Sequence, residues 1–556
     1  MGERRNPASG LAHRDGVSAE SIVSGAATEP PARRQEGRPA RRPNFLVFVT
    51  DEQRADHLGC AGNRVVLTPN IDDLARRGVR FDRCYVNNPL CQPARATLFT
   101  GLTARGHGVR TNGIPLNPAI PTMPDALRRG GYRTHAVGKL HLRNYSGQSP
   151  GAAANEAEMD HALESRAMWQ AGRIGSLPPN YEGLETTDFA GQHGPLIFGD
   201  YLTWLRGQDP DGPRLLTQAA GDVPASGAEE SWTMALPADL HYNTWVAERT
   251  IAFLRRQRGS ERPFFLWCSF PDPHYPYCPP RPWADIYRPE AVALPNRRDG
   301  ELDDLPPHFR MLFEGTGGRV SGRRNATRIR DDQMRDIIAL TYGMVSMVDH
   351  EVGRVMAEVD RLGLRDDTVV VLLSDHGDMM GDHWMLHKGP FHFDGLLRTP
   401  MIWSWPGRFA EGSVVGALVG HLDFAPTVLD VAGVPIPEGT TVDPPIASEQ
   451  PPPWPGVSLA PLLMGEATQV HEQLIVENDE DYLGLRVRTL VTEQFQITAY
   501  PGQPYGELFD RASDPMETRN FWGDASYEAL KKDLLVRLME EIVLTDSALP
   551  RRTATA

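Results

Sequence analysis

Three apolar, β-prone runs lie far apart in the chain, and each of them ends in polar side chains. The runs are 45–49 (FLVFV), 264–270 (FFLWCSF) and 368–373 (TVVVLL). Uninterrupted apolar strands of this kind are typical of a parallel sheet that is buried on both faces. The polar residues that follow the three runs are Asp51, Glu52, His274, Asp375 and His376. Because the carboxyl ends of parallel strands meet at one edge of an open α/β sheet, we expect these side chains to converge there.

Helical patterns alternate with further strands along most of the chain. We expect helices at 68–74, 121–129, 244–257, 334–362 and 423–432, and further strands at 79–86, 132–137 and 400–403. This alternation predicts an α/β fold with a large, mixed, mostly parallel sheet sandwiched by helices. The stretch 146–237 is rich in Gly, Pro, Ala and acidic residues, and we expect it to be loop-like.

The character of the pattern changes near the end of the chain. Short strands are expected at 485–490, 495–500 and 507–510, followed by a helix at 527–543. This order predicts a smaller antiparallel sheet packed on one helix. We therefore divide the chain into a disordered tail (1–42), a catalytic domain (43–465) and a C-terminal α+β subdomain with its tail (466–556).

A cysteine stands before a proline-started helix in the sequence NPLCQPARATLFTGLTARGHGVRTNG, which begins at residue 88. Pro93 is tolerated in the first turn of a helix, so Cys91 is predicted to lie at or just before a helix N-terminus. Free backbone N–H groups and the positive end of the helix dipole would then surround its side chain. Arg95, one turn further on, adds positive charge at the same end. An anion brought to position 91 would meet positive charge from two sources.

The pattern C-x-P-x-R-x-x-L-x-x-G, read from Cys91 to Gly101, resembles the signature of type I sulfatases in the alkaline phosphatase-like superfamily. In that family the cysteine is oxidised after translation to formylglycine. Five fixed positions match by chance with a probability on the order of 10⁻⁴ at average composition. The alternative interpretation is an inert buried cysteine. The resemblance implies that Cys91 is modified and that a formylglycine-generating enzyme is a partner during maturation.

The carboxylates and the imidazole at the strand ends have the chemistry of a site for a hard divalent cation. Carboxylate oxygens suit Ca²⁺, and the single imidazole leaves Mn²⁺ as an alternative. The resemblance places cation ligands at these strand ends, and the predicted ligands are Asp51, Glu52, Cys91, Asp375 and His376. Glu52 departs from the family pattern, since Asp is commoner there and related phosphonate and phosphodiester hydrolases often have Gln.

Three further elements resemble sulfatase motifs. Lys139 and His141 form a G-K-x-H element, and because they alternate at a strand end both can face the same side. His274 lies in an S-F-x-x-P-H-x-P element, whose prolines hold the loop stiffly enough to aim a general acid. Lys388 lies in a G-D-H…K-G segment, in which the family's lysine binds the substrate anion. Asn112 matches an anion-contacting position of some members.

The resemblance implies hydrolysis of a sulfate ester, with an arylsulfatase-like chemistry. The catalytic residues would be Cys91, Arg95, Lys139, His141, His274 and Lys388; the residues that bind substrate would be Asn112, Lys139, His274 and Lys388. Hydrated formylglycine at position 91 would attack sulfur, assisted by the cation and Arg95. His274 would protonate the departing alcohol or phenol, and His141 would remove a proton as sulfate leaves.

Composition limits the partners of the chain. Its net charge of −15 argues against nucleic acid or an anionic membrane as a bulk partner, so a small sulfated molecule is the expected one. The five cysteines are too few and odd in number for a disulfide framework, which fits a reducing compartment. With no secretory signal pattern in the sequence, we expect a cytoplasmic protein. The oligomeric state cannot be read from the sequence.

Two other functions stay open at this point. The first is a phosphonate monoester or phosphodiester hydrolase that uses the same formylglycine, because Glu52 and His376 fit either chemistry. The second is a catalytically silent protein that binds sulfated ligands and in which Cys91 is never converted.

Overall fold

The computed structural model describes residues 42–146, 156–315, 329–437, 455–480 and 483–546. Almost all of the predicted N-terminal tail (1–42) therefore lies outside the described residues. None of the described helices combines the length and the apolar character needed to span a bilayer.

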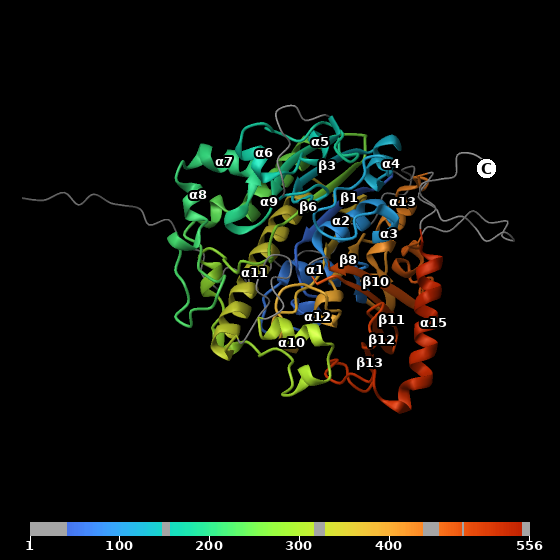
Figure 1. Ribbon diagram of the computed structural model, residues 1–556. Helices are drawn as coiled ribbons and strands as arrows, with labels where there is room; N and C mark the ends of the chain where they lie inside the picture. Colours follow the sequence, from blue (N-terminus) through green and yellow to red (C-terminus); the bar gives the residue numbers. More distant parts are fainter. Residues whose placement is uncertain (1–41, 147–155, 316–328, 438–454, 481–482, 547–556) are drawn as a thin grey trace, which may run out of the picture. The chain divides into compact units, whose positions relative to one another are not determined.

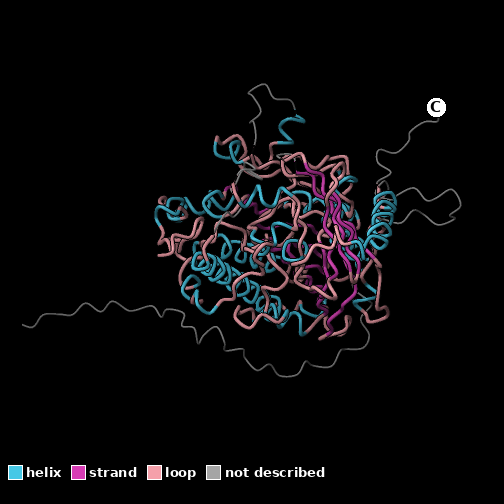
Figure 2. The backbone as a smooth tube through the Cα atoms, turned by 60° about the horizontal axis from the view of Figure 1, so that its bottom comes forward, coloured by secondary structure: helices cyan, strands magenta, loops and turns pink. Residues whose placement is uncertain are grey.

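A nine-stranded sheet forms the centre of the fold, in the order β5-β4-β3-β6-β1-β7-β8-β2-β9 (Figures 1 and 2). Its strands are β1 (Asn44–Thr50), β2 (Val79–Tyr85), β3 (Arg133–Gly138), β4 (Thr186–Gly191), β5 (Phe198–Gly199), β6 (Phe264–Ser269), β7 (Thr368–Ser374), β8 (Met401–Ser404) and β9 (Ser413–Gly420). Strand β1 runs parallel to both β6 and β7. Among the described strands of this sheet, only β8 and β5 run antiparallel to their neighbours. The predicted mixed, mostly parallel sheet is confirmed.

Two groups of helices pack against this sheet (Figure 1). Helices α1 (Pro69–Arg76), α9 (Tyr242–Arg256) and α11 (Asp331–Arg361) form one group, in which α11 contacts the other two. Helices α2 (Cys91–Thr100), α4 (Met123–Arg129) and α13 (Phe424–Ala432) form the other group. The buried strands between them explain the uninterrupted apolar runs, since both faces of β1, β6 and β7 are covered.

Further helices connect these elements. They are α3 (Ala104–His107), α5 (Glu156–His161), α6 (Arg166–Gln170), α7 (Asp200–Gln208), α8 (Gly212–Leu215), α10 (Pro307–Phe313), α12 (Asp394–Leu397) and α14 (Ala460–Leu463).

The stretch 146–237, which we expected to be loop-like, contains regular structure, and the structure corrects that prediction. Its strand β4 pairs in parallel with β3, and β5 adds the last strand at that edge of the sheet. Trp169 packs beside Phe189 and Phe198, whose ring centroids lie 5.6 Å apart. The three aromatic residues come from three short elements, α6, β4 and β5. Their spacing in the sequence therefore shows neither helical nor strand periodicity.

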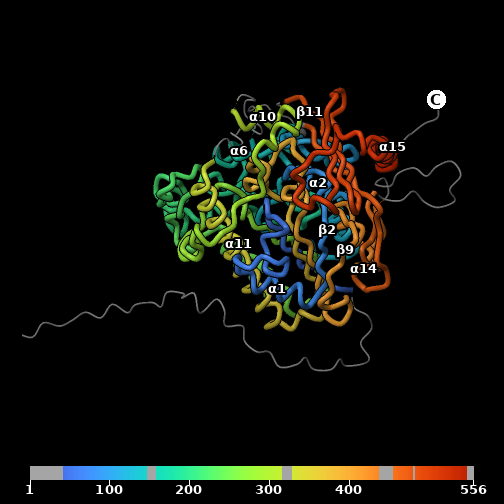
Figure 3. Tube along the Cα trace, turned by 90° about the horizontal axis from the view of Figure 1, so that it is seen from below, coloured from blue at the N-terminus to red at the C-terminus, as the bar shows by residue number. Residues whose placement is uncertain are grey.

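A separate four-stranded antiparallel sheet follows, as predicted, and Figure 3 shows this C-terminal part in red. It consists of β10 (Gln473–Glu480), β11 (Leu485–Thr492), β12 (Phe495–Ala499) and β13 (Gly506–Asp510), with α15 (Glu528–Leu544) packed against it. Strand β10 was not predicted, because its second half is the polar sequence Glu-Asn-Asp-Glu. The boundary at residue 465/466 stays a prediction.

Candidate active site

The ends of β1 and β7 bring two carboxylates together. Thr50 and Ser374 are paired in the register of the two parallel strands, so Asp51 and Asp375 follow at the same level of the sheet. Both side chains are fully buried. The backbone N–H of Glu52 donates to Oδ1 of Asp375 at 3.0 Å, which locks the two strand ends to each other.

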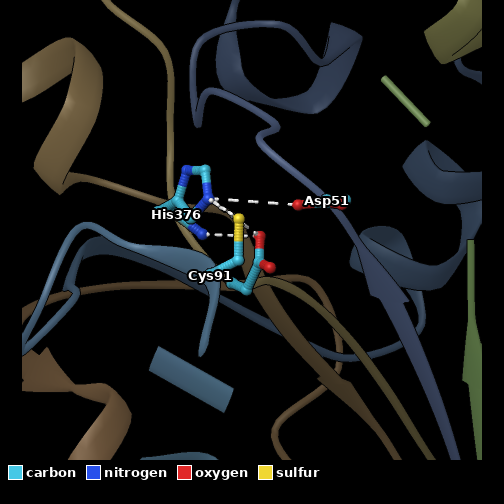
Figure 4. A group of neighbouring side chains, drawn as sticks. Asp51, Cys91 and His376 are labelled. Carbon is cyan, nitrogen blue, oxygen red and sulfur yellow. Dashed lines mark hydrogen bonds and ion pairs between the residues drawn. The ribbon is translucent and has the colours of Figure 1, made fainter. Parts of the chain in front are cut away.

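Asp51, Cys91, Asp375 and His376 form a compact buried group whose potential ligand atoms all lie within 4.8 Å of one another. Figure 4 shows the imidazole of His376 directed toward both the sulfur of Cys91 and the carboxylate of Asp51. Sγ of Cys91 lies 3.1 Å from Nε2 of His376. Nδ1 of the same ring lies 2.8 Å from the carbonyl oxygen of Gly377, which can only accept, so Nδ1 carries a hydrogen and Nε2 faces the group.

The donor set of this group fits a divalent cation. It offers two carboxylates and an imidazole, and Oδ1 of Asp51 is buried without a hydrogen-bond partner among the described residues. Burial is the largest effect and disfavours the charged imidazole, but Asp375 and Cys91 together outweigh it and raise the pKa of His376 to about 9. A cation and the proton on His376 would therefore compete for the same nitrogen.

Glu52, the other predicted ligand, lies apart from this group. Its Oε2 accepts from Nζ of Lys388 at 2.8 Å and lies 2.9 Å from Nε2 of His274. Its carboxylate belongs to a second cluster of possible ligands, with Asp378 and His387. The backbone at Glu52 is left-handed (φ 64°), and its side chain is directed toward the two basic partners.

Cys91 is the first residue of α2, as predicted from Pro93. The residue before it, Leu90, provides no side-chain cap. Instead Oδ1 of Asn112 accepts from the backbone N–H of Gln92 at 3.0 Å. Asn112 thus satisfies one of the free N–H groups at the start of this helix.

The electrostatic surroundings of Cys91 favour an anion. Burial alone would raise the pKa of the thiol, but Lys139 and Lys388 outweigh burial, so the pKa is lowered. This result agrees with the predicted positive environment of position 91. The positive charge near the thiol comes mainly from the two lysines and less from Arg95.

Arg95 is completely buried and joins three strand ends. Its Nε donates to Oδ2 of Asp375 at 2.7 Å. One terminal nitrogen donates to the carbonyl oxygen of Lys139 and to Oγ of Ser269, each at 3.0 Å. Arg95 therefore fixes Asp375 and the end of β3 relative to each other.

The two lysines of the site contact different carboxylates. Nζ of Lys139 forms an ion pair with Oδ2 of Asp51. Nζ of Lys388 contacts Glu52 and lies 2.8 Å from Nε2 of His274. Both lysines are at least 97 % buried and both lower the pKa of the Cys91 thiol, so an anion at position 91 would be strongly attracted.

His141 is held by a residue that the sequence analysis missed. The fully buried carboxylate of Glu164 accepts from the backbone N–H groups of His141 at 2.7 Å, Leu142 at 2.9 Å and Arg143 at 3.2 Å. The ring of His141 stacks on Tyr145 with centroids 3.9 Å apart. No sequence motif marks Glu164, since it lies in a turn between the short helices α5 and α6.

His193 is the second residue that was missed. Its ring stacks on that of His274 with centroids 3.5 Å apart. It follows the end of β4, so the strand-end argument that found Asp51 would have found it if β4 had been recognised. The site thus combines a buried position for a nucleophile, a candidate cation group that includes His376, two ammonium groups and three further imidazoles.

Several known proteins are similar to this chain in sequence and architecture. A family model described as Sulfatase matches residues 43–434, which is more than half of the chain. The chain belongs to the sulfatase family. A model described as the C-terminal part of N-sulphoglucosamine sulphohydrolase matches residues 381–543.

The sulfatase is similar to several known proteins. It is 27% identical to an arylsulfatase of Clostridium perfringens, over 88% of this chain and 92% of that protein. It is also 27% identical to the uncharacterized sulfatase YidJ of Escherichia coli, over 90% of this chain and 88% of that protein. The phosphonate monoester hydrolase of Agrobacterium radiobacter superposes with a TM-score of 0.75 at 26% identity, covering 93% of this chain and 98% of that one. The sulfatase is therefore a sulfuric ester hydrolase with the alkaline phosphatase-like fold.

Proposed function

We propose that the sulfatase cleaves sulfate esters with formylglycine at position 91 and one divalent cation held by Asp51, Asp375 and His376. The observation that carries this proposal is the 4.8 Å group in which Cys91 meets those three side chains. Sγ of Cys91 stands in for a hydroxyl oxygen of the hydrated aldehyde. The cation, when bound, would stabilise negative charge on the oxygen at this position.

The residues around position 91 support attack on a sulfate group. Lys139 and Lys388 would neutralise the sulfate oxygens as negative charge builds on them. The sulfo group would transfer to the oxygen at position 91 as its bond to the alcohol oxygen breaks, and the alcohol would leave with a proton delivered from the side of His274 and Lys388. His141 would then accept a proton as sulfate is released, which restores the aldehyde and completes the addition of one water.

Burial at position 91 bears on when the modification is made. Only 3 % of Cys91 is exposed. We propose that the formylglycine-generating enzyme acts on the segment 91–101 before folding is complete. All five cysteines are free, in keeping with a reducing compartment, and we propose that maturation takes place in the cytoplasm.

For the cation we propose Ca²⁺, with Mn²⁺ as the alternative that the imidazole of His376 favours. Metal analysis of the purified chain, followed by chelation and separate addition of each ion, distinguishes them. Activity should return with one of the two ions, whereas undiminished turnover in the chelated chain would refute the proposed cation.

The second candidate function is phosphonate monoester hydrolysis, favoured by the similarity to the Agrobacterium enzyme. The two functions are separated by kcat/KM for a matched aryl sulfate and aryl phosphonate monoester, with Cys91→Ala as the control. We expect the sulfate to be preferred because two ammonium groups suit its three oxygens. A preference for the phosphonate would mean that phosphonate monoester hydrolysis is the main reaction.

A further inference from the structure

His193 lies beside two residues of the candidate active site, Asp51 and His274. It is 6 % exposed and is delivered by the segment between β4 and β5. A ring nitrogen of His193, one of His274 and a carboxylate oxygen of Asp51 lie within 4.8 Å of one another. Nothing in the signature around Cys91 or in the other sequence motifs assigns a role to this residue.

The hydrogen bonds of the two stacked imidazoles differ. In His274, Nδ1 lies 2.5 Å from the carbonyl oxygen of Tyr275, and Nε2 is engaged with Lys388 and Glu52. Both nitrogens of His274 are therefore in use. Nδ1 of His193, by contrast, is buried and has no hydrogen-bond partner among the described residues.

A second cation is a poor explanation for the group of Asp51, His193 and His274. Lys139 already pairs with Asp51, and Lys388 already contacts His274. A further cation would have to displace one ammonium group and lie close to the other. An uncharged donor facing a substrate oxygen fits these surroundings better.

We propose that His193 is a further catalytic residue, which donates a hydrogen bond from its neutral imidazole to the oxygen of the departing alcohol. This inference rests on the proposed sulfate ester hydrolysis. The stack on His274 fixes the ring, and the buried surroundings strengthen a hydrogen bond to an oxygen that gains negative charge. No proton needs to be lost from His193, since the alcohol takes its proton from the side of His274 and Lys388.

The test is a series of aryl sulfates whose phenols differ in pKa, hydrolysed by the wild-type chain, His193→Phe and His193→Gln. Phenylalanine keeps a flat ring for the stack but has no donor, whereas glutamine keeps a donor. For the poorest leaving group we expect His193→Phe to lower kcat/KM by about 10- to 100-fold, with a loss under about threefold for 4-nitrophenyl sulfate. The slope of log kcat/KM against phenol pKa should steepen, and His193→Gln should recover part of the loss.

A loss of equal size across the whole series, or no loss at all, would overturn the proposal, since either result means that His193 only supports the packing of His274. If the wild-type chain hydrolysed aryl phosphonates in place of sulfates, the proposed function would fail, and the same series made with phosphonate esters would decide the role of His193. A wild-type chain with Cys91 converted that hydrolysed neither ester would refute both.

Discussion

Nζ of Lys388 lies 2.8 Å from the carboxylate of Glu52 and 2.8 Å from the imidazole of His274, so these three side chains form one buried unit beside position 91. The carboxylate of Glu52 therefore pairs with a lysine, although Glu52 directly follows Asp51 in the sequence.

We expect Glu52→Gln to keep the cation, because the ligand group consists of other residues. Asp51→Asn is the matched variant and should lose most of it. Metal content per chain is the measurement, and loss of the cation in both variants would restore Glu52 as a ligand.

Glu164 should affect turnover through His141. Its carboxylate binds three successive N–H groups, including that of His141, whose backbone is left-handed (φ 59°). Glu164→Gln removes the charge that holds this turn, and we expect kcat to fall by about 10-fold or more, with KM changed much less. Tyr181→Phe, which removes only the hydroxyl that donates to Glu164, should have a milder effect. Equal kcat values for the wild type and Glu164→Gln would rule out the positioning role.

Part of this site could be predicted from the sequence and part could not. The apolar runs before Asp51, His274 and Asp375 identify buried parallel strands, and the topology of such sheets then brings their ends together. The assignment of Glu52 depends on the direction of a single side chain, which strand patterns do not determine. Glu164 and His193 come from short elements without periodicity, so only tertiary packing identifies them.

The same limit applies to Asn112. The family resemblance suggests an anion contact, which stays a prediction, and the structure shows that Oδ1 of Asn112 caps the helix that begins at Cys91. A capping oxygen and an anion-binding amide look alike in a sequence. Which of the two groups faces the substrate depends on the loop geometry.

Arg95 should be essential for stability as well as for chemistry. Its guanidinium and the carboxylate of Asp375 are both fully buried, so Arg95→Ala leaves an unpaired charge in the core. We expect a loss of about 3–5 kcal/mol in the free energy of unfolding. Arg83→Ala is the control, because its ion pair with Glu493 is largely exposed and is worth less than about 1 kcal/mol. Urea unfolding monitored by fluorescence measures both, and similar midpoints for the two variants would contradict the role of Arg95.

The C-terminal sheet should make stability depend on pH through Glu507. This side chain is fully buried and receives a hydrogen bond from Tyr500 at 3.2 Å, while burial raises the pKa of its carboxyl to about 8. Between the ordinary pKa of 4.5 and about 8, the folded chain keeps a proton that the unfolded chain has released. The contribution of Glu507 is therefore complete below about pH 4.5 and is lost as the pH rises toward 8.

Glu507→Gln should remove this contribution. We expect the fall in Tm between pH 5 and pH 8.5 to be smaller in the variant than in the wild type, and the variant to be the more stable of the two at pH 8.5. Differential scanning fluorimetry at both pH values is the measurement. Parallel pH profiles would mean that Glu507 has a similar pKa in the folded and unfolded chain.

The chemical state of position 91 tests the central claim most directly. Mass spectrometry of the peptide that spans Cys91, from chain produced in its native host, reports the fraction converted to formylglycine. We predict that the rate of aryl sulfate hydrolysis per chain rises in proportion to that fraction across preparations and falls to background in Cys91→Ala. Full activity in a preparation whose residue 91 is entirely an unmodified thiol would contradict the account.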